Sequence, residues 1–467
     1  MTYINTAKSL VKRKISVSEL EVDLSKQERE EIELLVVASQ KCLKNIKFKI
    51  KEKSKITQKF KNQLSEQERA GLKIQVAEIS GEIKHTESEL KEREFRLCEI
   101  LSASKAQQLP IQFTVSKTEQ FRTAPLTFAV LQLQDEWEVQ WSQFLSEIEQ
   151  HSAYHRPQWL QVLSDYSGFE VFLFVLKLDD KIVAGVPMLF MKSFLFGKSM
   201  VSVPYVNYGG MVSYSSELTT KLFAHMKNWA TEQNIDYFEF RTTSPELNLP
   251  VKSEKSSMVL RLPSTNAQLE EQLTAKVRAQ YKKANAYKPQ VVFGGLELLN
   301  DFYKVFARNM RDLGTPVYSK ALFMKILQNE DISSFLCVVK INNEPVSVAF
   351  LTGYRDMLEI PWASTVKSAN KYDANMWMYR MILQKAIDLG YEYFDFGRST
   401  IDASTYKFKK QWRAQPIAHH WYYLLKSGEL PQTNPNNPKY RFLIAVWKRL
   451  PVWLANIIGP HIVKSIP

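Results

Sequence analysis

Cysteine and histidine are scarce in this chain of 467 residues. Its cysteines, Cys42, Cys98 and Cys337, are odd in number and form no Cys-x-x-Cys pair, and its histidines are scattered. A disulfide framework needs an even set of cysteines, and a zinc site needs clustered cysteine or histidine ligands. We therefore expect no bound metal and a reducing compartment.

The sequence also lacks an apolar run long enough to cross a bilayer, which takes roughly 18 residues or more. The closest stretch, 441–463, is broken by Lys448, Arg449, Pro451 and Pro460. The N-terminal MTYINTAKSLVKRK is basic but has no apolar core before a cleavage site, which disfavours a secretory signal. We predict a cytoplasmic protein whose amphipathic tail, residues 426–467, packs on the body or contacts the inner face of the membrane.

Three catalytic signatures are missing as well: a G-x-S-x-G elbow, a neighbouring Cys/His pair and an H-E-x-x-H motif. Their absence disfavours serine-hydrolase and zinc mechanisms. Hydrophobic residues, in contrast, make up 45% of the chain and aromatics 12%, which is ample material for buried cores. The formal charge of +13 indicates either a polyanionic partner or simple solubility.

Residues 25–104 are rich in Glu, Lys, Gln and Leu and contain no proline. Ser25 with Glu28 and Ser65 with Glu68 match the capping box that begins a helix. Apolar residues recur at helical spacing in both predicted helices: Ile32, Leu35, Leu43, Ile46 and Ile50, then Leu72, Val76, Ile79, Ile83, Leu90, Leu97 and Leu101. We predict an antiparallel coiled-coil hairpin within residues 1–107.

Lysines crowd the outer half of this hairpin, between residues 41 and 61, where Glu52 alone opposes them. Such a surface can neutralise RNA phosphates, and the candidate RNA-binding residues are Lys44, Lys47, Lys51 and Lys55. A solvated spacer or a dimerisation helix is the alternative interpretation.

After residue 112 strands and helices alternate, which predicts α/β lobes at residues 113–263 and 264–425. Two segments of the first lobe have counterparts in the second. VFLFVLKLDDKIVAGVPMLF at 171–190 parallels SFLCVVKINNEPVSVAFLTG at 334–353, and each reads as two strands joined by a polar two-residue turn. KNWATEQNIDYFEFR at 227–241 parallels LQKAIDLGYEYFDFGR at 383–398. A duplicated fold explains both echoes.

The order of elements in each repeat resembles the GNAT acyltransferase fold. Five local runs are similar to FemAB-like proteins associated with exosortase and exopolysaccharide systems: MKSFLFGKSMVSVPYVNYGG, TAKVRAQYKKA, FYKVFARNMRDLGTPVY, EIPWASTVKSANKYDANMWMYR and YFDFGRSTIDASTYKFKKQW. The resemblance extends from about residue 151 to the end of the chain. It implies an α/β (α+β) protein with two tandem GNAT-like lobes behind the helical hairpin.

Fem peptidyltransferases transfer an amino acid from aminoacyl-tRNA to the peptide of a peptidoglycan precursor, so the resemblance implies an acyltransferase. Cell-wall Fem enzymes carry their helical arm inside the second lobe, whereas here the hairpin precedes both lobes. Its layout is similar to the tRNA-binding arm of seryl-tRNA synthetases. GNAT enzymes that use acetyl-coenzyme A carry a glycine-rich loop at a helix start, where this chain reads SANKYDAN before Ala374.

An activated donor needs no covalent enzyme intermediate, so positioning and oxyanion stabilisation suffice. Asp395 and Arg398, after a predicted strand, are the candidate catalytic residues: the carboxylate can accept a proton, and the guanidinium can clamp a phosphate or carboxylate. A structural ion pair is the alternative.

Other candidate residues for substrate binding fall in three groups. The predicted helix at 266–286 carries a basic cluster suited to phosphates, and PYVNYGG offers a loop with two glycines. The third group is expected to line the same cleft as Asp395. The candidates are Lys276, Arg278, Lys282 and Lys283, then Tyr205, Asn207 and Tyr208, and finally Trp362, Ser364, Asn375, Tyr406, Lys409 and Trp412.

We predict transfer of an aminoacyl or acyl group to an amine of a cell-envelope or exopolysaccharide precursor. The co-substrate is aminoacyl-tRNA, recruited by the arm, or an acyl-coenzyme A, with no bound cofactor. The alternatives are a coenzyme A or carrier-dependent sugar N-acyltransferase and a non-catalytic polysaccharide assembly factor.

Overall fold

The computed structural model describes residues 26–60, 65–106, 125–132, 137–148, 151–193, 197–243, 249–426, 430 and 438–466. The chain divides into two compact units, Met1–Thr114 and Val115–Pro467. Within these described ranges no helix is both long and apolar enough to cross a membrane.

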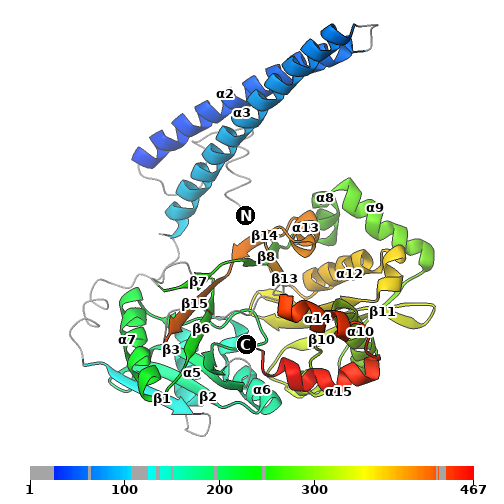
Figure 1. Cartoon of the computed structure of the whole chain (residues 1–467). Coiled ribbons are helices and arrows are strands. Elements are labelled where there is room, and N and C mark those ends of the chain that lie inside the picture. Colours follow the sequence, from blue (N-terminus) through cyan, green and yellow to red (C-terminus); the bar gives the residue numbers. More distant parts are fainter. Residues whose placement is uncertain are drawn as a thin grey trace. The chain divides into compact units, whose positions relative to one another are not determined.

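The first unit contains two long helices, α2 (Lys26–Lys59) and α3 (Glu66–Ala106), which pack side by side (Figure 1). They run antiparallel, because Glu31 pairs with Arg96 while Lys49 pairs with Glu82. The capping box at Ser65 forms as predicted, with Glu68 accepting from both the amide and the hydroxyl group of Ser65.

The buried stripe of α2 differs in part from its predicted seam. Buried positions follow Ile32 at spacings of three and four, through Val36, Ser39, Cys42 and Ile46. Leu35 is only half-buried, and Ile50 is 51% exposed. The polar Ser39 lies in the stripe, which hides the true phase of the pattern. In α3 the predicted seam holds for the side chains that the structure describes, with Ile79 and Leu97 buried.

The first sheet orders its strands β1-β2-β3-β4-β6-β15-β7, and β5 adds to β3. We call this sheet and the helices around it the first lobe. Its strands are β1 (Thr127–Gln132), β2 (Val171–Leu178), β3 (Lys181–Ser193), β4 (Gly197–Val201), β5 (Val212–Ser213), β6 (Tyr237–Thr242), β7 (Val251–Lys252) and β15 (His420–Leu425). Its helices are α5 (Glu138–Glu147), η2 (Ala153–His155), α6 (Pro157–Ser167) and α7 (Ser216–Glu232).

The second sheet orders its strands β14-β8-β13-β12-β11-β10-β9 and forms the second lobe. Its strands are β8 (Lys255–Arg261), β9 (Gln290–Gly294), β10 (Ser334–Ile341), β11 (Glu344–Tyr354), β12 (Met357–Thr365), β13 (Tyr393–Thr400) and β14 (Gln415–Ala418). Its helices are α8 (Asn266–Gln272), α9 (Ala275–Lys283), η3 (Ala284–Tyr287), η4 (Leu296–Leu298), α10 (Leu299–Leu313), α11 (Lys320–Gln328), η5 (Lys367–Tyr372), α12 (Ala374–Asp388) and α13 (Ser404–Gln411).

The duplicated hairpins form as predicted in both lobes. Asp179–Asp180 and Asn342–Asn343 make the two-residue turns, with positive φ at all four residues. Short polar side chains tolerate the left-handed region, and such turns match the twist of the flanking strands.

The predicted boundary at residues 263/264 does not follow the sheets. β8, expected in the first lobe, pairs with β13 in the second sheet, and β15, expected in the second lobe, pairs with β6 in the first. Figure 1 shows the orange β15 among the green strands β6 and β7. The lobes therefore exchange a strand after each repeat, which ties them into one unit.

The tail forms two helices, α14 (Pro438–Trp447) and α15 (Val452–Val463). Arg311 of α10 donates to the carbonyl of Leu450 between them (2.8 Å), and a Cβ at Gly459 would lie 2.9 Å from the Val317 nitrogen. The tail thus packs closely on the second lobe.

Candidate active site between the two lobes

The parallel strands β12 and β13 pair over three residues and then separate. The last pair in register is Glu359 with Asp395. Partners in register point to the same face of a sheet, so both carboxyl groups lie together where the strands part. We call Glu359 and Asp395 the carboxyl pair.

Side chains of the first lobe cover Glu359. The Tyr154 hydroxyl donates to Oε2 (2.6 Å), and Nδ2 of Asn207 donates to Oε1 (2.6 Å). Burial and the charge of Asp395 raise the pKa of Glu359 to about 8. This carboxyl group is therefore mostly protonated at neutral pH.

Asp395 is fully buried and takes two hydrogen bonds. The Tyr208 hydroxyl donates to Oδ2, and the amide of Gly397 donates to Oδ1 (2.8 Å). Burial raises the pKa of Asp395, while these two donors oppose the rise. The pair titrates together, and we assign its negative charge to Asp395 and its proton to Glu359.

Lys409 of α13 brings a cation to the point where the strands part. Its ammonium group donates to the carbonyls of Gly397 (2.9 Å) and Arg398 (3.1 Å). Burial lowers the pKa of Lys409 to about 8. An amine and two carboxyl groups are thus close to their titration points in one dry site.

The loop of the first lobe that reaches the carboxyl pair is strained. Val203 and Tyr205 have φ of 49° and 75°, a region that side chains rarely adopt. Gly209 and Gly210 let the loop close on itself, since a Cβ there would meet the Ser202 carbonyl at 2.6 Å and Thr242 at 2.7 Å. These glycines thus serve close packing within the protein.

The first lobe has no equivalent carboxyl pair. At the matching position of β4 and β6, Val201 stands in register with Glu239. Val201 thus replaces Glu359, and Glu239 is occupied by Arg241 (2.8 Å). The chemistry is accordingly confined to the second lobe.

The structure brings several predicted residues together here: Asp395, Arg398, Asn207, Tyr208 and Lys409. Tyr205 lies beside them, but its hydroxyl is bound by the carbonyl of Lys464 in the tail (2.7 Å).

The other predicted cleft residues are structural. Trp362 packs edge-on against Phe323 and Phe350, and Trp412 is fully buried near Tyr379. Both lie in the apolar core. The polar members serve local contacts or are buried: Ser364 accepts from Asn309 (3.0 Å), Asn375 accepts from Thr365 (3.3 Å), and Tyr406 is 9% exposed.

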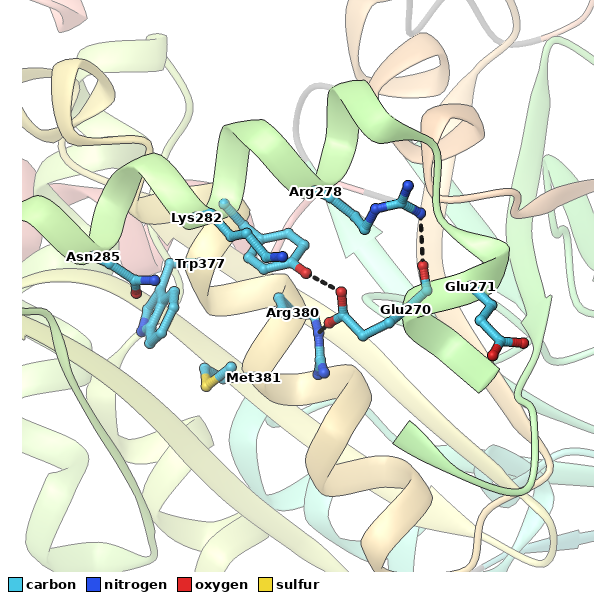
Figure 2. Close-up of a pocket in the computed structure, with 9 residues that line it drawn as sticks. Glu270, Glu271, Arg278, Lys282, Asn285, Trp377, Arg380 and Met381 are labelled. Atoms are coloured by element: carbon cyan, nitrogen blue, oxygen red, sulfur yellow. Dashed lines mark hydrogen bonds and ion pairs between the residues drawn. The ribbon is translucent and has the colours of Figure 1, made fainter. Parts of the chain in front are cut away.

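The basic cluster predicted on one helix lies on α9, because the chain breaks between α8 and α9 at Leu273 and Thr274 caps the new helix. The cluster borders a hollow of ≈ 680 Å³ beside α12 (Figure 2). Arg278 lines the hollow, but its Nη1 donates to the carbonyl of Glu270 (2.8 Å), so that nitrogen is already engaged. Lys282 lines the hollow, Lys276 is exposed, and Lys283 pairs with Asp373 (3.0 Å).

Charges in this hollow are largely compensated by the protein. Arg380 pairs with Glu270 (2.7 Å), which also accepts from the Tyr281 hydroxyl, as Figure 2 shows. The hollow therefore offers shape more than unpaired charge, and we place the chemistry at the carboxyl pair.

The start of α12 does not fit the pyrophosphate of coenzyme A. Asp373 immediately precedes the helix and already places a carboxylate there, held by Lys283. A helix start binds one anion favourably, and a second would be repelled.

The arm presents the predicted RNA-binding lysines to solvent. Lys44, Lys47, Lys51 and Lys55 are all exposed and follow each other at spacings of three and four along α2. They therefore form one basic stripe.

Sequence reasoning missed Glu359, Tyr154, Arg241, His419 and Trp421. The echo between YFEFR and YFDFGR was a usable signal for Arg241, since it aligns Arg241 with Arg398. Glu359 was visible only as a polar residue inside a strand. Among the described residues, no group of three or more His, Cys, Asp or Glu side chains could hold a metal ion.

Comparisons with known proteins agree with this architecture. FemX is 13% identical, with a TM-score of 0.46, covering 66% of this chain and 98% of FemX. L-PGS from Bacillus licheniformis is 16% identical, with a TM-score of 0.41, covering 67% and 97%. A tandem GNAT protein from the clavulanic acid pathway is 9% identical, with a TM-score of 0.43, covering 66% and 100%. A search of curated proteins found no match.

A family comparison identifies the second lobe. Residues 272–410 match the acetyltransferase (GNAT) domain. The matched region contains the carboxyl pair and Lys409. The prediction of a mixed α/β fold with tandem GNAT-like lobes is confirmed, and the chain is an acyltransferase.

Proposed function

We propose that this acyltransferase moves an aminoacyl or acyl group to an amine of a cell-envelope or exopolysaccharide precursor. The observation that carries the proposal is the carboxyl pair at the parting of β12 and β13, which the second lobe has and the first lacks. The acceptor class rests on the resemblance of the sequence runs to FemAB-like proteins.

The residues support a direct transfer. The acceptor nitrogen attacks the donor carbonyl carbon, an N–C bond forms, and the ester or thioester bond breaks. The proton lost by nitrogen passes to Asp395, directly or through the Tyr208 hydroxyl that bonds it. Glu359 holds a proton that can be given to the leaving oxygen or sulfur, and Lys409 favours the negative charge on Asp395.

Aminoacyl-tRNA is the donor that we favour. The carboxylate of Asp373 at the start of α12 opposes a coenzyme A pyrophosphate, and the exposed lysine stripe of α2 suits an RNA backbone. No covalent enzyme intermediate is needed, because the ester of aminoacyl-tRNA is already activated.

The tail supports contact with an anionic membrane at the cytoplasmic face. α15 packs inward through Ala455, Gly459 and Val463, yet Trp453 and Ile457 on its outer side are 65% and 59% exposed. No acidic residue follows Glu429, whereas the outward groups listed next are basic or apolar: Leu443, Val446, Lys448, Arg449, Ile458, Ile462 and Ile466. An apolar face with a cationic border is typical of a helix that lies on anionic lipid.

The test measures loss of donor when the full chain is incubated with total aminoacyl-tRNA or mixed acyl-coenzyme A and a sugar-amine acceptor. We expect tRNA ester consumption that depends on Asp395. Consumption of acyl-coenzyme A alone would overturn the donor assignment, and no consumption of either donor would favour an assembly factor.

The arm is tested by tRNA binding across a salt series. Replacing Lys44, Lys47, Lys51 and Lys55 with Ala should weaken binding and reduce the slope of log K against log salt by about 3. A matched variant with four exposed lysines of the lobes replaced should bind like the native chain: Lys181, Lys227, Lys304 and Lys320. Equal effects of both variants would contradict a role for the arm.

A further inference from the structure

Two arginines from equivalent positions of the duplicated lobes meet at one indole ring. Arg241 comes from β6 and Arg398 from β13, and the YFEFR and YFDFGR echo aligns them. Their guanidinium carbons lie 4.5 Å and 4.7 Å from the ring centroid of Trp421 in the exchanged strand β15. The exchange of strands thus brings one cation from each lobe to a shared aromatic platform.

The positive charge of this cluster is only partly compensated. Arg241 is paired with buried Glu239 (2.8 Å), which also accepts from the Tyr423 hydroxyl (3.0 Å). Within the described ranges Arg398 forms no ion pair, and Lys255 adds a further cation close enough to affect it electrostatically. Like charges held together in a partly buried site favour an anion that neutralises them.

Three nitrogens of the cluster are buried and have no hydrogen-bond partner in the described structure: Nη1 of Arg398, Nε1 of Trp421 and Nδ1 of His419. His419 is fully buried, and its Nε2 contacts the Ser257 hydroxyl (2.9 Å). Burial lowers the pKa of His419 to about 3, with both arginines contributing, so the ring is neutral. When Nε2 accepts from Ser257, Nδ1 carries the hydrogen and joins the other two nitrogens as a donor.

Buried polar groups are normally satisfied, so three unpartnered donors beside an uncompensated guanidinium indicate a missing acceptor. We propose that Arg398, Arg241, Trp421 and His419 bind a phosphoryl group of a substrate. Its charge of more than one unit suits the excess of cations better than a single carboxylate would, and its several oxygens can accept from all three donors.

The phosphoryl group would be held beside the carboxyl pair. The His419 ring stacks on Tyr208 with centroids 5.3 Å apart, and the Tyr208 hydroxyl donates to Asp395. That the bound group belongs to a reacting substrate rests on the proposed function; binding itself does not. Two sources share this chemistry: the backbone of a tRNA donor and the diphosphate of a lipid-linked acceptor.

The experiment measures binding of inorganic pyrophosphate to the full chain by calorimetry and by thermal shift. Arg398→Gln should weaken binding at least tenfold, while Arg261→Gln, an exposed arginine of β8, should not. Without pyrophosphate Arg398→Gln should keep or raise Tm, because no ion pair is lost; a lower Tm with unchanged binding would make Arg398 structural and overturn the proposal. Equal binding by the native chain and both variants would also overturn it.

Competition then identifies the source of the phosphoryl group. Displacement of pyrophosphate by uncharged tRNA, also in the variant lacking the four arm lysines, assigns the site to the donor. Displacement by a short polyprenyl diphosphate assigns it to the acceptor. Arg398-dependent pyrophosphate binding without any acyl transfer would keep the site and overturn only the proposed function.

Discussion

Glu359 makes the stability of the lobes depend on pH in a way that one substitution isolates. Its pKa rises from 4.5 to about 8 through burial and the neighbouring charge of Asp395. Between these values the folded chain keeps a proton that the unfolded chain has released, so the free energy of unfolding falls as pH rises through this window. Glu359→Gln removes that titration and preserves an oxygen that can accept from Tyr154 or Asn207.

The separation of the two pKa values corresponds to on the order of 5 kcal/mol, at about 1.4 kcal/mol for each pH unit. At roughly 2 °C per kcal/mol for a unit of this size, the Tm of the Gln variant relative to the native chain should rise by about 5–10 °C between pH 5 and pH 8. Lys409, with its pKa lowered to about 8, adds stability only as pH rises above that value, and it does so in both proteins.

Scanning calorimetry at constant ionic strength, in half-unit pH steps, measures this difference. Glu330→Gln, at an exposed position, is the matched control and should show no trend. A Tm difference for Glu359→Gln that stays flat, or falls with pH, would refute the raised pKa and with it the assignment of the proton to Glu359.

Three further perturbations test the site and the tail. Asp395→Asn should lower kcat by roughly 10²–10⁴-fold with an unchanged circular dichroism spectrum, because the proton acceptor is lost; Asp356→Asn, in an exposed turn, should match the native rate. Tyr208→Phe removes a hydrogen bond that lowers the pKa of Asp395, so the acidic limb of the pH–rate profile should move to higher pH, and an unmoved limb would contradict the contact. Trp453→Glu with Ile457→Glu should reduce sedimentation with phosphatidylglycerol vesicles at least roughly tenfold at constant Tm, and undiminished binding would remove the tail from the membrane.

The repeated local patterns carried most of the fold. Alternating strands, polar two-residue turns at 179–180 and 342–343, and capping boxes are short-range signals, and each formed as predicted. The exchange of β8 and β15 was out of reach, because a strand's own residues favour an extended backbone without specifying the sheet that receives it. That choice depends on pairing between distant segments.

The candidate site was predictable to the same extent. Asp395 and Arg398 stand out after a strand, but Glu359 gains its meaning only from its register with Asp395. Trp362 and Trp412 show the opposite error: they were placed in the cleft because they adjoin polar motifs, although large aromatics are more often buried in a core.

Duplication followed by divergence explains how the two lobes divide their work. Both lobes keep an acid and an arginine at the end of the equivalent strand, Glu239 with Arg241 and Asp395 with Arg398. In the first lobe the acid neutralises its own arginine, so that lobe retains a fixed ion pair. In the second lobe Asp395 instead faces Glu359, which leaves the acid free for proton transfer and leaves Arg398 without a carboxylate partner among the described residues. The same change of partner therefore accounts for both the carboxyl pair and the uncompensated cation beside it.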